Sequence, residues 1–254
     1  MADDLTLAHE LADLADSMTM ARWRAADLRV ETKPDLTPVT EADKAVEAAL
    51  RGRLADARPG DAVFGEEQGG AALGGGRRWI LDPIDGTRNY VRGLPVFATL
   101  IALEVDGRYD VGLVSAPALR QRWWAARGRG AHSNDGPIHV SRVAAIPDAY
   151  ISAGDSSYFK DPAVRTAYAA LANRCWTSRA LGDFWPHVLV AEGSIDISVE
   201  MGASLWDWAP LLVIVEEAGG RFTDLDGTVR ADGAAAIVSN GLLHDEVLAA
   251  LQGR

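Results

Sequence analysis

Two aspartates with a proline between them lie in the segment WILDPIDGTRN, which runs from Trp79 to Asn89. Asp82 and Asp85 follow an apolar run typical of a buried strand, and Pro83 fixes its own φ and stiffens the bend. Two carboxylates at this spacing can converge on one small volume at a strand end. Mg²⁺ prefers such hard oxygen ligands. The segment therefore predicts a magnesium site.

The residues that follow Asp85 offer groups for an anion. Gly86 permits a close approach of the backbone to a ligand, and Gly86 and Thr87 open a short predicted helix with the sequence TRNYV. Free N–H groups at a helix N-terminus favour phosphate. We expect the carbonyl of Ile84 to point into the same space as a neutral metal ligand, so one turn would offer both metal ligands and phosphate donors.

Acids in two other segments are candidates for the same site. Glu66, followed by Glu67, ends the buried-looking strand AVFG, where it could complete a metal shell or orient a water molecule. Asp207 lies in the first turn of an otherwise apolar helix, where a buried acid needs a partner or a metal. Adjacent acids also occur in solvated loops, and an acid in a first turn also suits the helix dipole. A simple turn, however, explains only one of the two aspartates in residues 82–87.

The composition is that of an acidic globular chain. Its 254 residues carry a net charge of −11, which makes it a poor candidate for nucleic-acid binding because phosphates need basic surface. A small phosphorylated metabolite would also be repelled unless bound cations receive it. No apolar run approaches the ~20 residues of a membrane span, the acidic N-terminus is unlike a secretory signal, and the single cysteine, Cys175, excludes an internal disulfide. We therefore expect a cytoplasmic protein with no nucleic-acid or membrane partner.

The chain divides into two halves with different sequence patterns, and elements of both must position these residues. Residues 1–145 begin with two amphipathic helices, the second capped by Thr40 with Asp43 after it, and continue with strands joined by tight turns such as Asp106-Gly107. Residues 146–254 alternate strands and helices, which is α/β patterning. We expect an N-terminal α+β half with an antiparallel sheet and most metal ligands, and a C-terminal α/β half that completes the site. The glycine-rich segment 69–76 lacks the ending of a P-loop and is expected to be a flexible linker or lid.

Three motifs resemble those of the inositol monophosphatase superfamily. WILDPIDGTRNYVR is similar to its first signature, WDWAPLLVIVEEAGGRFTDLDG to its second, and VFGEEQGG to the glutamate motif that precedes them. They occur in the family's order, and the resemblance covers essentially the whole chain. It implies a layered αβαβα sandwich of the inositol monophosphatase (fructose-bisphosphatase-like) type. It also implies a Mg²⁺-dependent phosphomonoesterase that uses two to three ions and assembles as a homodimer.

The resemblance further implies a role for each residue. Glu66 and Thr87 would hold and activate the attacking water, and Asp43 would partner the threonine. The backbone amides of Gly86 and Thr87 would seat the phosphate, and Lys33 would lie near the outermost metal. No covalent phosphoenzyme is implied, and all five histidines are expected to be structural or surface residues. The residues that resemble the family's metal ligands are Glu66, Asp82, Ile84 (through its carbonyl), Asp85 and Asp207.

The substrate is indicated by other segments. Within the superfamily the chain is most similar to the actinobacterial histidinol-phosphate phosphatases, in stretches such as DLRVETKPDLTPVTEAD and SRALGDFWPHVLVAEGSIDISVE. Asp183 and Glu200, with Arg179 nearby, are the expected substrate contacts, because a carboxylate pair can hold an ammonium group or hydroxyls. The alternative is that they are ordinary charged residues of surface loops. Trp123 and Trp124 could present an aromatic surface to an imidazole, although tryptophans in a hairpin are more often core residues. The expected reaction is the hydrolysis of L-histidinol phosphate to L-histidinol and phosphate, a step of histidine biosynthesis.

Two other functions are open at this point. An inositol-1-phosphate phosphatase, or a broader sugar phosphatase, would use the same metal site with a different leaving group. A non-catalytic protein-binding module would keep the fold without turnover. Retention of every predicted metal ligand argues against this last alternative.

Overall fold

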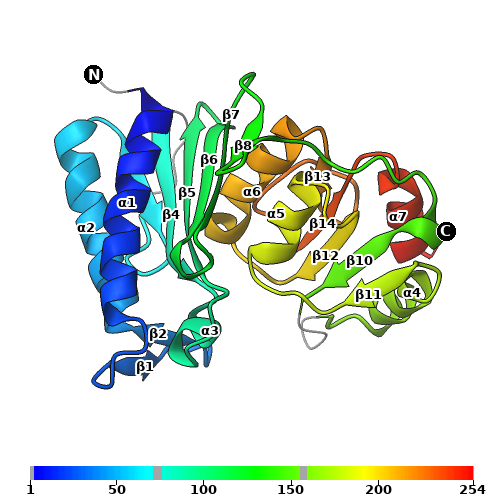
Figure 1. Cartoon of the computed structure of the whole chain (residues 1–254), viewed down its shortest axis with the longest axis horizontal. Coiled ribbons are helices and arrows are strands. Elements are labelled where there is room, and N and C mark those ends of the chain that lie inside the picture. Colours follow the sequence, from blue (N-terminus) through cyan, green and yellow to red (C-terminus); the bar gives the residue numbers. More distant parts are fainter. Residues whose placement is uncertain (1–2, 71–75, 155–158, 254) are drawn as a thin grey trace.

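Helices and sheets alternate in layers in the computed structural model, which describes residues 3–70, 76–154 and 159–253. Its longer helices are α1 (Asp4–Arg22), α2 (Glu41–Ala57), α4 (Pro162–Ala172), α5 (Trp185–Ala191), α6 (Leu205–Glu217) and α7 (His244–Leu251). Figure 1 shows α1 and α2 on the outer face of one sheet, α5 and α6 between two sheets, and α4 and α7 beyond the second sheet. The expected αβαβα sandwich is confirmed. Of the expected linker or lid, residues 71–75 lie outside the described residues.

The larger sheet has seven strands in the order β3-β4-β5-β6-β7-β8-β9. Neighbouring strands are antiparallel except β3 and β4, which are parallel. The predicted hairpin between β5 and β6 is confirmed, since φ is 49° at Asp106 and 83° at Gly107, the positive values of a tight two-residue turn. The strands are β3 (Ala62–Gly65), β4 (Arg77–Asp85), β5 (Ala98–Val105), β6 (Arg108–Ala116), β7 (Gln121–Ala126), β8 (Ala131–Ser133) and β9 (Gly136–Ile138).

Helices α1 and α2 each bury an apolar face against this sheet. Leu11 and Leu50 are buried in the same cluster as Trp79 of β4, and full burial of a leucine side chain contributes roughly 1.5–3 kcal/mol. The predicted cap of α2 is present: Thr40 Oγ1 accepts from the Asp43 amide, and Asp43 Oδ2 accepts from the Thr40 amide. This packing and capping fix the position of Asp43 at the start of α2.

The smaller sheet has five strands in the order β11-β10-β12-β14-β13. Strand β10 is parallel to β11 and β12, whereas β14 is antiparallel to β12 and β13. The sequence pattern predicted β10, β12 and β14, but β11 and β13 are too short for an alternation to be visible. The strands are β10 (Tyr150–Ala153), β11 (Thr177–Arg179), β12 (Ile197–Met201), β13 (Arg221–Thr223) and β14 (Ala235–Ser239).

Helix α6 lies between the two sheets and contacts both. Its residues from Trp208 to Val215 are all buried, which is why the helix is apolar all round. Gly112 of β6 permits the close approach, because a Cβ there would lie 2.3 Å from the carbonyl oxygen of Pro210. The contact holds the N-terminus of α6, with Asp207, against the larger sheet.

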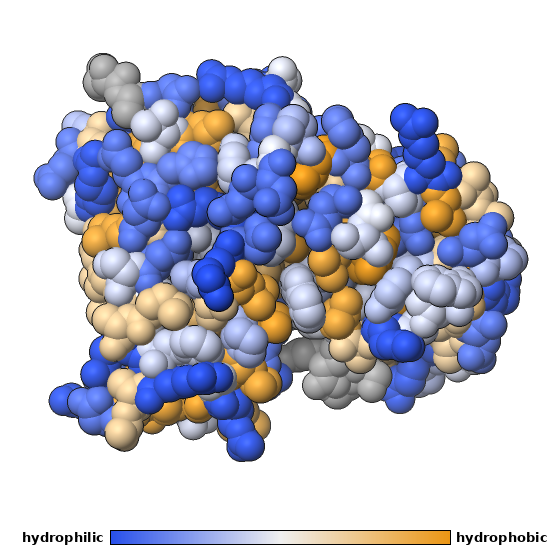
Figure 2. Space-filling view, in the orientation of Figure 1, coloured by the Kyte–Doolittle hydropathy of each residue, from blue (hydrophilic) through white to orange (hydrophobic). Residues whose placement is uncertain are grey.

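Short elements complete the surroundings of Asp85. Helix α3 (Thr87–Val91) follows β4 directly, and the hairpin of β1 (Val30–Thr32) and β2 (Pro38–Thr40) lies next to it, with β2 contacting α3. Hydrophilic side chains predominate on the face of the molecule in Figure 2. Among the described residues, no helix combines the length and the apolar character needed to cross a membrane.

Candidate metal and phosphate site

Three aspartates from two distant segments meet where β4 ends. Carboxylate oxygens of Asp82, Asp85 and Asp207 lie within 4.8 Å of one another. The register of β4 against β5 shifts between Asp82 and Asp85, so the strand bends around Pro83 and both side chains face the same space. Backbone amides orient the group: Ile84 N donates to Asp82 Oδ1 at 3.0 Å, and Phe184 N donates to Asp85 Oδ2 at 2.6 Å. The structure therefore brings together the three predicted aspartate ligands.

Burial makes this cluster electrostatically unfavourable by itself. Desolvation, together with the neighbouring carboxylates, raises the pKa of Asp82 and Asp85 well above their ordinary value. Burial likewise raises the pKa of Asp207 to about 7. A cation placed among these oxygens would reverse both effects, because it favours the charged forms. Hard carboxylate oxygens such as these are the ligands that Mg²⁺ takes.

Glu66 lies at the end of β3 and is paired with Lys33. Lys33 Nζ is 2.7 Å from Glu66 Oε1 and 2.7 Å from Glu67 Oε1. The lysine was expected near the outermost metal, and the structure places its ammonium group on a predicted metal ligand. Glu66 lines the same cavity as Asp85 and Asp207, so the structure brings it to the aspartates.

Glu47 of α2 supports this loop from behind, a role that the sequence did not indicate. Its fully buried carboxylate accepts hydrogen bonds from the amides of Glu67 at 2.7 Å and Gln68 at 3.1 Å. Arg51 Nε, 2.8 Å from Glu47 Oε1, balances the charge. The available signal was a charged residue on the face of α2 that also carries Val46, Leu50 and Leu54.

Thr87 stands between the aspartates and Asp43. Its hydroxyl lies 3.0 Å from the carbonyl oxygen of Ile84 and 3.5 Å from Asp43 Oδ1. Burial raises the pKa of Asp43 to about 6, and its other oxygen accepts from the amide and hydroxyl of Thr40 at 2.8 and 2.6 Å. Gly86 has a φ of 79° and carries no capping side chain at the start of α3. The predicted threonine–aspartate pair is thus present, as a long contact.

A cavity of 740 Å³ opens beside the aspartates. Asp183 and Glu200 line it, as do the expected metal ligands Glu66, Asp85 and Asp207. Asp183 has a φ of 58°, and its Oδ2 accepts from Asn89 Nδ2 at 2.8 Å. Burial, then the nearby charge of Glu200, raises the pKa of Asp183 to about 6. Two acids thus face the space next to the predicted phosphate seat.

Arg179 does not join these acids, which corrects the expectation from the sequence. It is exposed on β11, and its guanidinium donates to Thr177 Oγ1 at 3.1 Å and to the Ser178 carbonyl at 2.8 Å. The tryptophan pair is a second correction. Trp123 is buried and donates through Nε1 to Glu192 Oε2 at 2.9 Å, and Trp124 packs on the opposite face of the sheet against His9.

A histidine behind Glu200 was missed. His187 of α5 is fully buried, and its Nε2 lies 2.7 Å from Glu200 Oε2. The expectation that every histidine is structural or on the surface holds for His244, which is buried between the hydroxyls of Thr223 and Ser239. It misses the contact of His187 with a predicted substrate residue. Nothing in the linear spacing relates position 187 to position 200 before the strand order is known.

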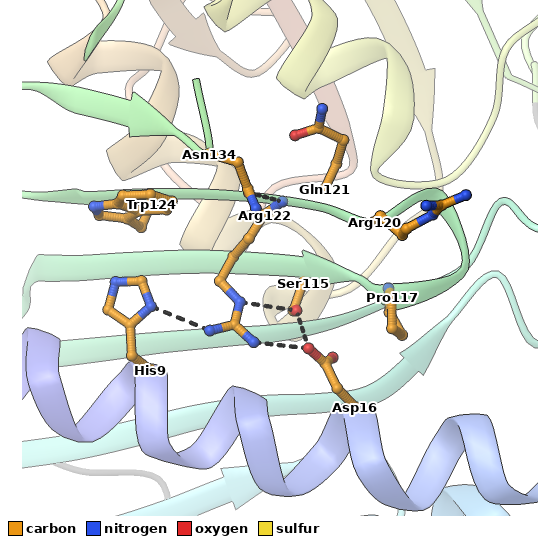
Figure 3. A pocket seen from close by; sticks show the side chains of 9 residues that line it. All are labelled: His9, Asp16, Ser115, Pro117, Arg120, Gln121, Arg122, Trp124 and Asn134. Carbon is orange, nitrogen blue, oxygen red and sulfur yellow. Dashed lines mark hydrogen bonds and ion pairs between the residues drawn. The ribbon is translucent and has the colours of Figure 1, made fainter. Parts of the chain in front are cut away.

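A second cavity, of 580 Å³, lies between α1 and the edge of β6 and β7. Figure 3 shows Arg122 at its centre, with the guanidinium pointing toward α1. Its nitrogens lie 2.7 Å from Asp16 Oδ2, 3.0 Å from Ser115 Oγ and 3.3 Å from His9 Nδ1. None of the predicted metal or phosphate residues is among those that line it, whereas Trp124 is. The arrangement ties α1 to the sheet.

Comparisons with known proteins agree over the whole chain. A sequence model of the inositol monophosphatase family matches residues 2–254. The chain is 54% identical over 254 residues to the histidinol-phosphatase of Mycobacterium tuberculosis, covering 98% of each protein. It is 52% identical over 261 residues to the histidinol-phosphatase of Streptomyces coelicolor, covering 99% of this chain and 98% of the relative. A solved IMPase of Thermotoga maritima matches with a TM-score of 0.90 at 32% identity, covering 99% of this chain and 98% of that one.

Proposed function

Because the chain belongs to the inositol monophosphatase family, we propose that it is a phosphoric monoester hydrolase that converts L-histidinol phosphate to L-histidinol and phosphate. The observation that carries the proposal is the position of two carboxylates, Asp183 and Glu200, in the cavity beside the aspartate cluster. Histidinol phosphate combines a phosphate with an ammonium group. The aspartate cluster, with its cations bound, would receive the phosphate. The two carboxylates would face the ammonium group. Full-length relatives that are histidinol-phosphatases support the same substrate.

The residues present fit Mg²⁺. We assign the two to three ions to the oxygens of Glu66, Asp82, Asp85, Asp207 and the Ile84 carbonyl, since a cation would offset the raised pKa values of the three buried aspartates. When bound, the metal would supply positive charge for the phosphate and lower the pKa of a water molecule. Lys33 would contribute a further positive charge beside Glu66.

Thr87 and its neighbours would handle the proton of the attacking water. The single hydroxyl hydrogen of Thr87 can point to the Ile84 carbonyl at 3.0 Å or to Asp43 at 3.5 Å. Either choice leaves lone pairs on Oγ1 to accept a hydrogen bond from water. Glu66 would accept the second hydrogen, and the amides of Gly86 and Thr87 would hold phosphate oxygens. Phosphoryl transfer then depends mainly on positioning and charge neutralisation.

The two halves of the chain would divide these tasks. Residues 1–145 would supply most metal ligands and the water-binding groups, and residues 146–254 would supply Asp207 and the contacts to the leaving group. The ammonium of histidinol would lie between Asp183 and Glu200. The same proposal includes a place in histidine biosynthesis, a cytoplasmic location and assembly as a homodimer, which the family resemblance implies.

Phosphate release tests the proposal directly. We expect Mg²⁺-dependent release from L-histidinol phosphate with a higher kcat/KM than from inositol 1-phosphate, and loss of both activities in EDTA. A preference for inositol 1-phosphate or sugar phosphates would favour the alternative substrate class. Absence of turnover with every phosphomonoester, in protein that is folded and supplied with Mg²⁺, would favour a non-catalytic binding role.

A further inference from the structure

His187 contacts the cavity only through another residue. It lies on α5, fully buried, with Nε2 2.7 Å from Glu200 Oε2 on β12. Its ring packs 6.5 Å, centre to centre, from Phe222, which in turn packs against Trp208. The imidazole is thus held by buried aromatic side chains, whereas Glu200 borders the cavity. A rigid group behind a cavity carboxylate can fix the direction in which that carboxylate points.

The surroundings of the ring select one protonation form. A carboxylate oxygen is an acceptor, so the nitrogen that faces Glu200 must carry hydrogen for a hydrogen bond to exist. The other ring nitrogen, Nδ1, is buried and has no hydrogen-bond partner among the residues that the structure describes. A hydrogen on Nδ1 would be a buried, unsatisfied donor, which is costly. The neutral imidazole with hydrogen on Nε2 is therefore the form that suits this position.

Glu200 needs such a restraint because its neighbours repel it. Asp183, a second acid, lines the same cavity as Glu200, and like charges repel. A free glutamate side chain would relieve this repulsion by turning away from the acids toward solvent. The charge-assisted hydrogen bond from His187 opposes that rotation. On the other side, a Cβ on Gly154 would lie only 3.1 Å from Glu200 Oε1, so the carboxylate fits closely between β10 and α5.

We propose that His187 is a positioning residue for leaving-group selection, which holds the carboxylate of Glu200 toward the cavity, where it can receive the substrate's ammonium group. The inference rests on the proposed function. A neutral donor orients the carboxylate and leaves its charge available. The pairing of Glu66 with Lys33 is different, because an ammonium group there already balances the carboxylate.

Two substitutions separate donation from packing. His187→Gln keeps an N–H near the position of Nε2, whereas His187→Leu fills space without a donor. We expect His187→Leu to raise KM for L-histidinol phosphate about 10-fold, since hydrogen bonds to charged groups are among the stronger ones, with little change in kcat. Hydrolysis of glycerol 2-phosphate, which has a neutral leaving group, should change far less. His187→Gln should restore most of the selectivity.

A matched control and a spectrum complete the test. His244→Gln alters another buried imidazole, on α7, and should leave the selectivity unchanged. In the intact protein, ¹⁵N NMR should show the His187 ring with hydrogen on Nε2, a readout that does not depend on whether a variant folds. Equal losses with both substrates in His187→Leu, no rescue by His187→Gln, or hydrogen on Nδ1 would each overturn the role of His187.

Failure of the proposed function would look different. An intact enzyme that hydrolyses glycerol 2-phosphate better than L-histidinol phosphate would contradict the substrate itself. An intact enzyme with the expected preference, which His187→Leu retains in full, would contradict only the role of His187.

Discussion

Gly65 leaves room for the carboxylate of Glu47: a Cβ at position 65 would lie 2.4 Å from Glu47 Oε1. That carboxylate in turn accepts the amides of Glu67 and Gln68, and so orients the loop that begins with Glu66. Gly65→Ala should displace this loop and weaken Mg²⁺ binding by about 10–100-fold, the usual effect of losing support behind a metal ligand. Activity measured across a Mg²⁺ titration checks the shift.

Gly60→Ala is the matched control for this substitution. No atom of the described part of the chain lies within 4 Å of a Cβ at position 60, so the Mg²⁺ dependence of its activity should equal that of the unaltered enzyme. A Gly65→Ala enzyme with the same Mg²⁺ dependence would show that Glu47 does not control the position of Glu66.

Asp85→Asn should preserve the fold and remove most activity. A neutral amide is a poor Mg²⁺ ligand, and charge stabilisation of this kind is worth about 100–1,000-fold in kcat. The amide oxygen can still accept from Phe184 N, 2.6 Å from the carboxylate, so the circular dichroism spectrum should be unchanged. Near-normal phosphate release by this variant would mean that the metal assignment is wrong.

The metal-free protein should become less stable as pH rises from about 4 to about 7. Burial raises the pKa of Asp207 to about 7 from an ordinary 3.8, so the folded state holds its proton longer than the unfolded state does. The free energy of unfolding therefore falls with pH in this window and levels off above it. Asp207→Asn removes this pH-dependent contribution to the free energy of unfolding. The variant should be more stable than the unaltered protein at pH 8, but not at pH 4.

Urea unfolding in EDTA at several pH values measures that difference. The Asp27→Asn variant, altered at an exposed side chain, serves as control. Its free energy of unfolding should change with pH in the same way as that of the unaltered protein. Added Mg²⁺ should stabilise the unaltered protein far more at pH 8 than at pH 5, because binding needs the charged carboxylates. A stability difference between Asp207→Asn and the unaltered protein that does not vary with pH would contradict the raised pKa.

Thr87→Ala should lower kcat by about 100-fold or more, the range seen when a proton-handling group is removed. The hydroxyl lies 3.0 Å from the Ile84 carbonyl, so Thr87→Ser, which keeps it, should retain most activity. Steady-state kinetics at saturating Mg²⁺ compare the two variants. Equal losses in both would point to packing of the methyl group instead of the hydroxyl.

Arg122→Met should destabilise the protein without changing its kinetics. The guanidinium, 17% exposed, bridges Asp16 and Ser115 (Figure 3). Its loss leaves Asp16 without this counter-charge, at a cost of about 1–3 kcal/mol in free energy of unfolding. Arg108→Met, whose side chain is 69% exposed beside Asp110, should lower the free energy of unfolding far less, as expected for a surface pair. Denaturant unfolding and phosphate release measure the two effects.

Local sequence pattern predicted the elements whose signals are local. The cap at Thr40, the hairpin at Asp106-Gly107 and the apolar helix after Asp207 each follow from spacing within a few residues. The convergence of Asp82, Asp85 and Asp207 was expected from the family motifs and is present in the structure. Each of these features is indicated by a combination of residue types that rarely occurs together for any other structural reason.

Contacts between distant segments could not be predicted in the same way. The support of the Glu66 loop by Glu47, and of Glu200 by His187, depends on which helix lies behind which strand. Arg179 was expected in the site because it is close to Asp183 in sequence, but β11 is an edge strand and leaves its side chain in solvent. Short strands such as β11 carry no alternation from which the edge could be recognised.

The position of α6 between the sheets has a consequence for how this scaffold can change. Glu66, Asp82, Asp85 and Thr87 lie on or beside the larger sheet, whereas Asp183 lies just before α5 and Glu200 lies on β12 of the smaller sheet. Substitutions confined to residues 183–203 can therefore alter the choice of leaving group while the hydrolytic groups keep their places. Directed evolution toward new phosphate esters has a natural target there, and gene duplicates that diverge in this region can acquire new substrates while retaining one chemistry.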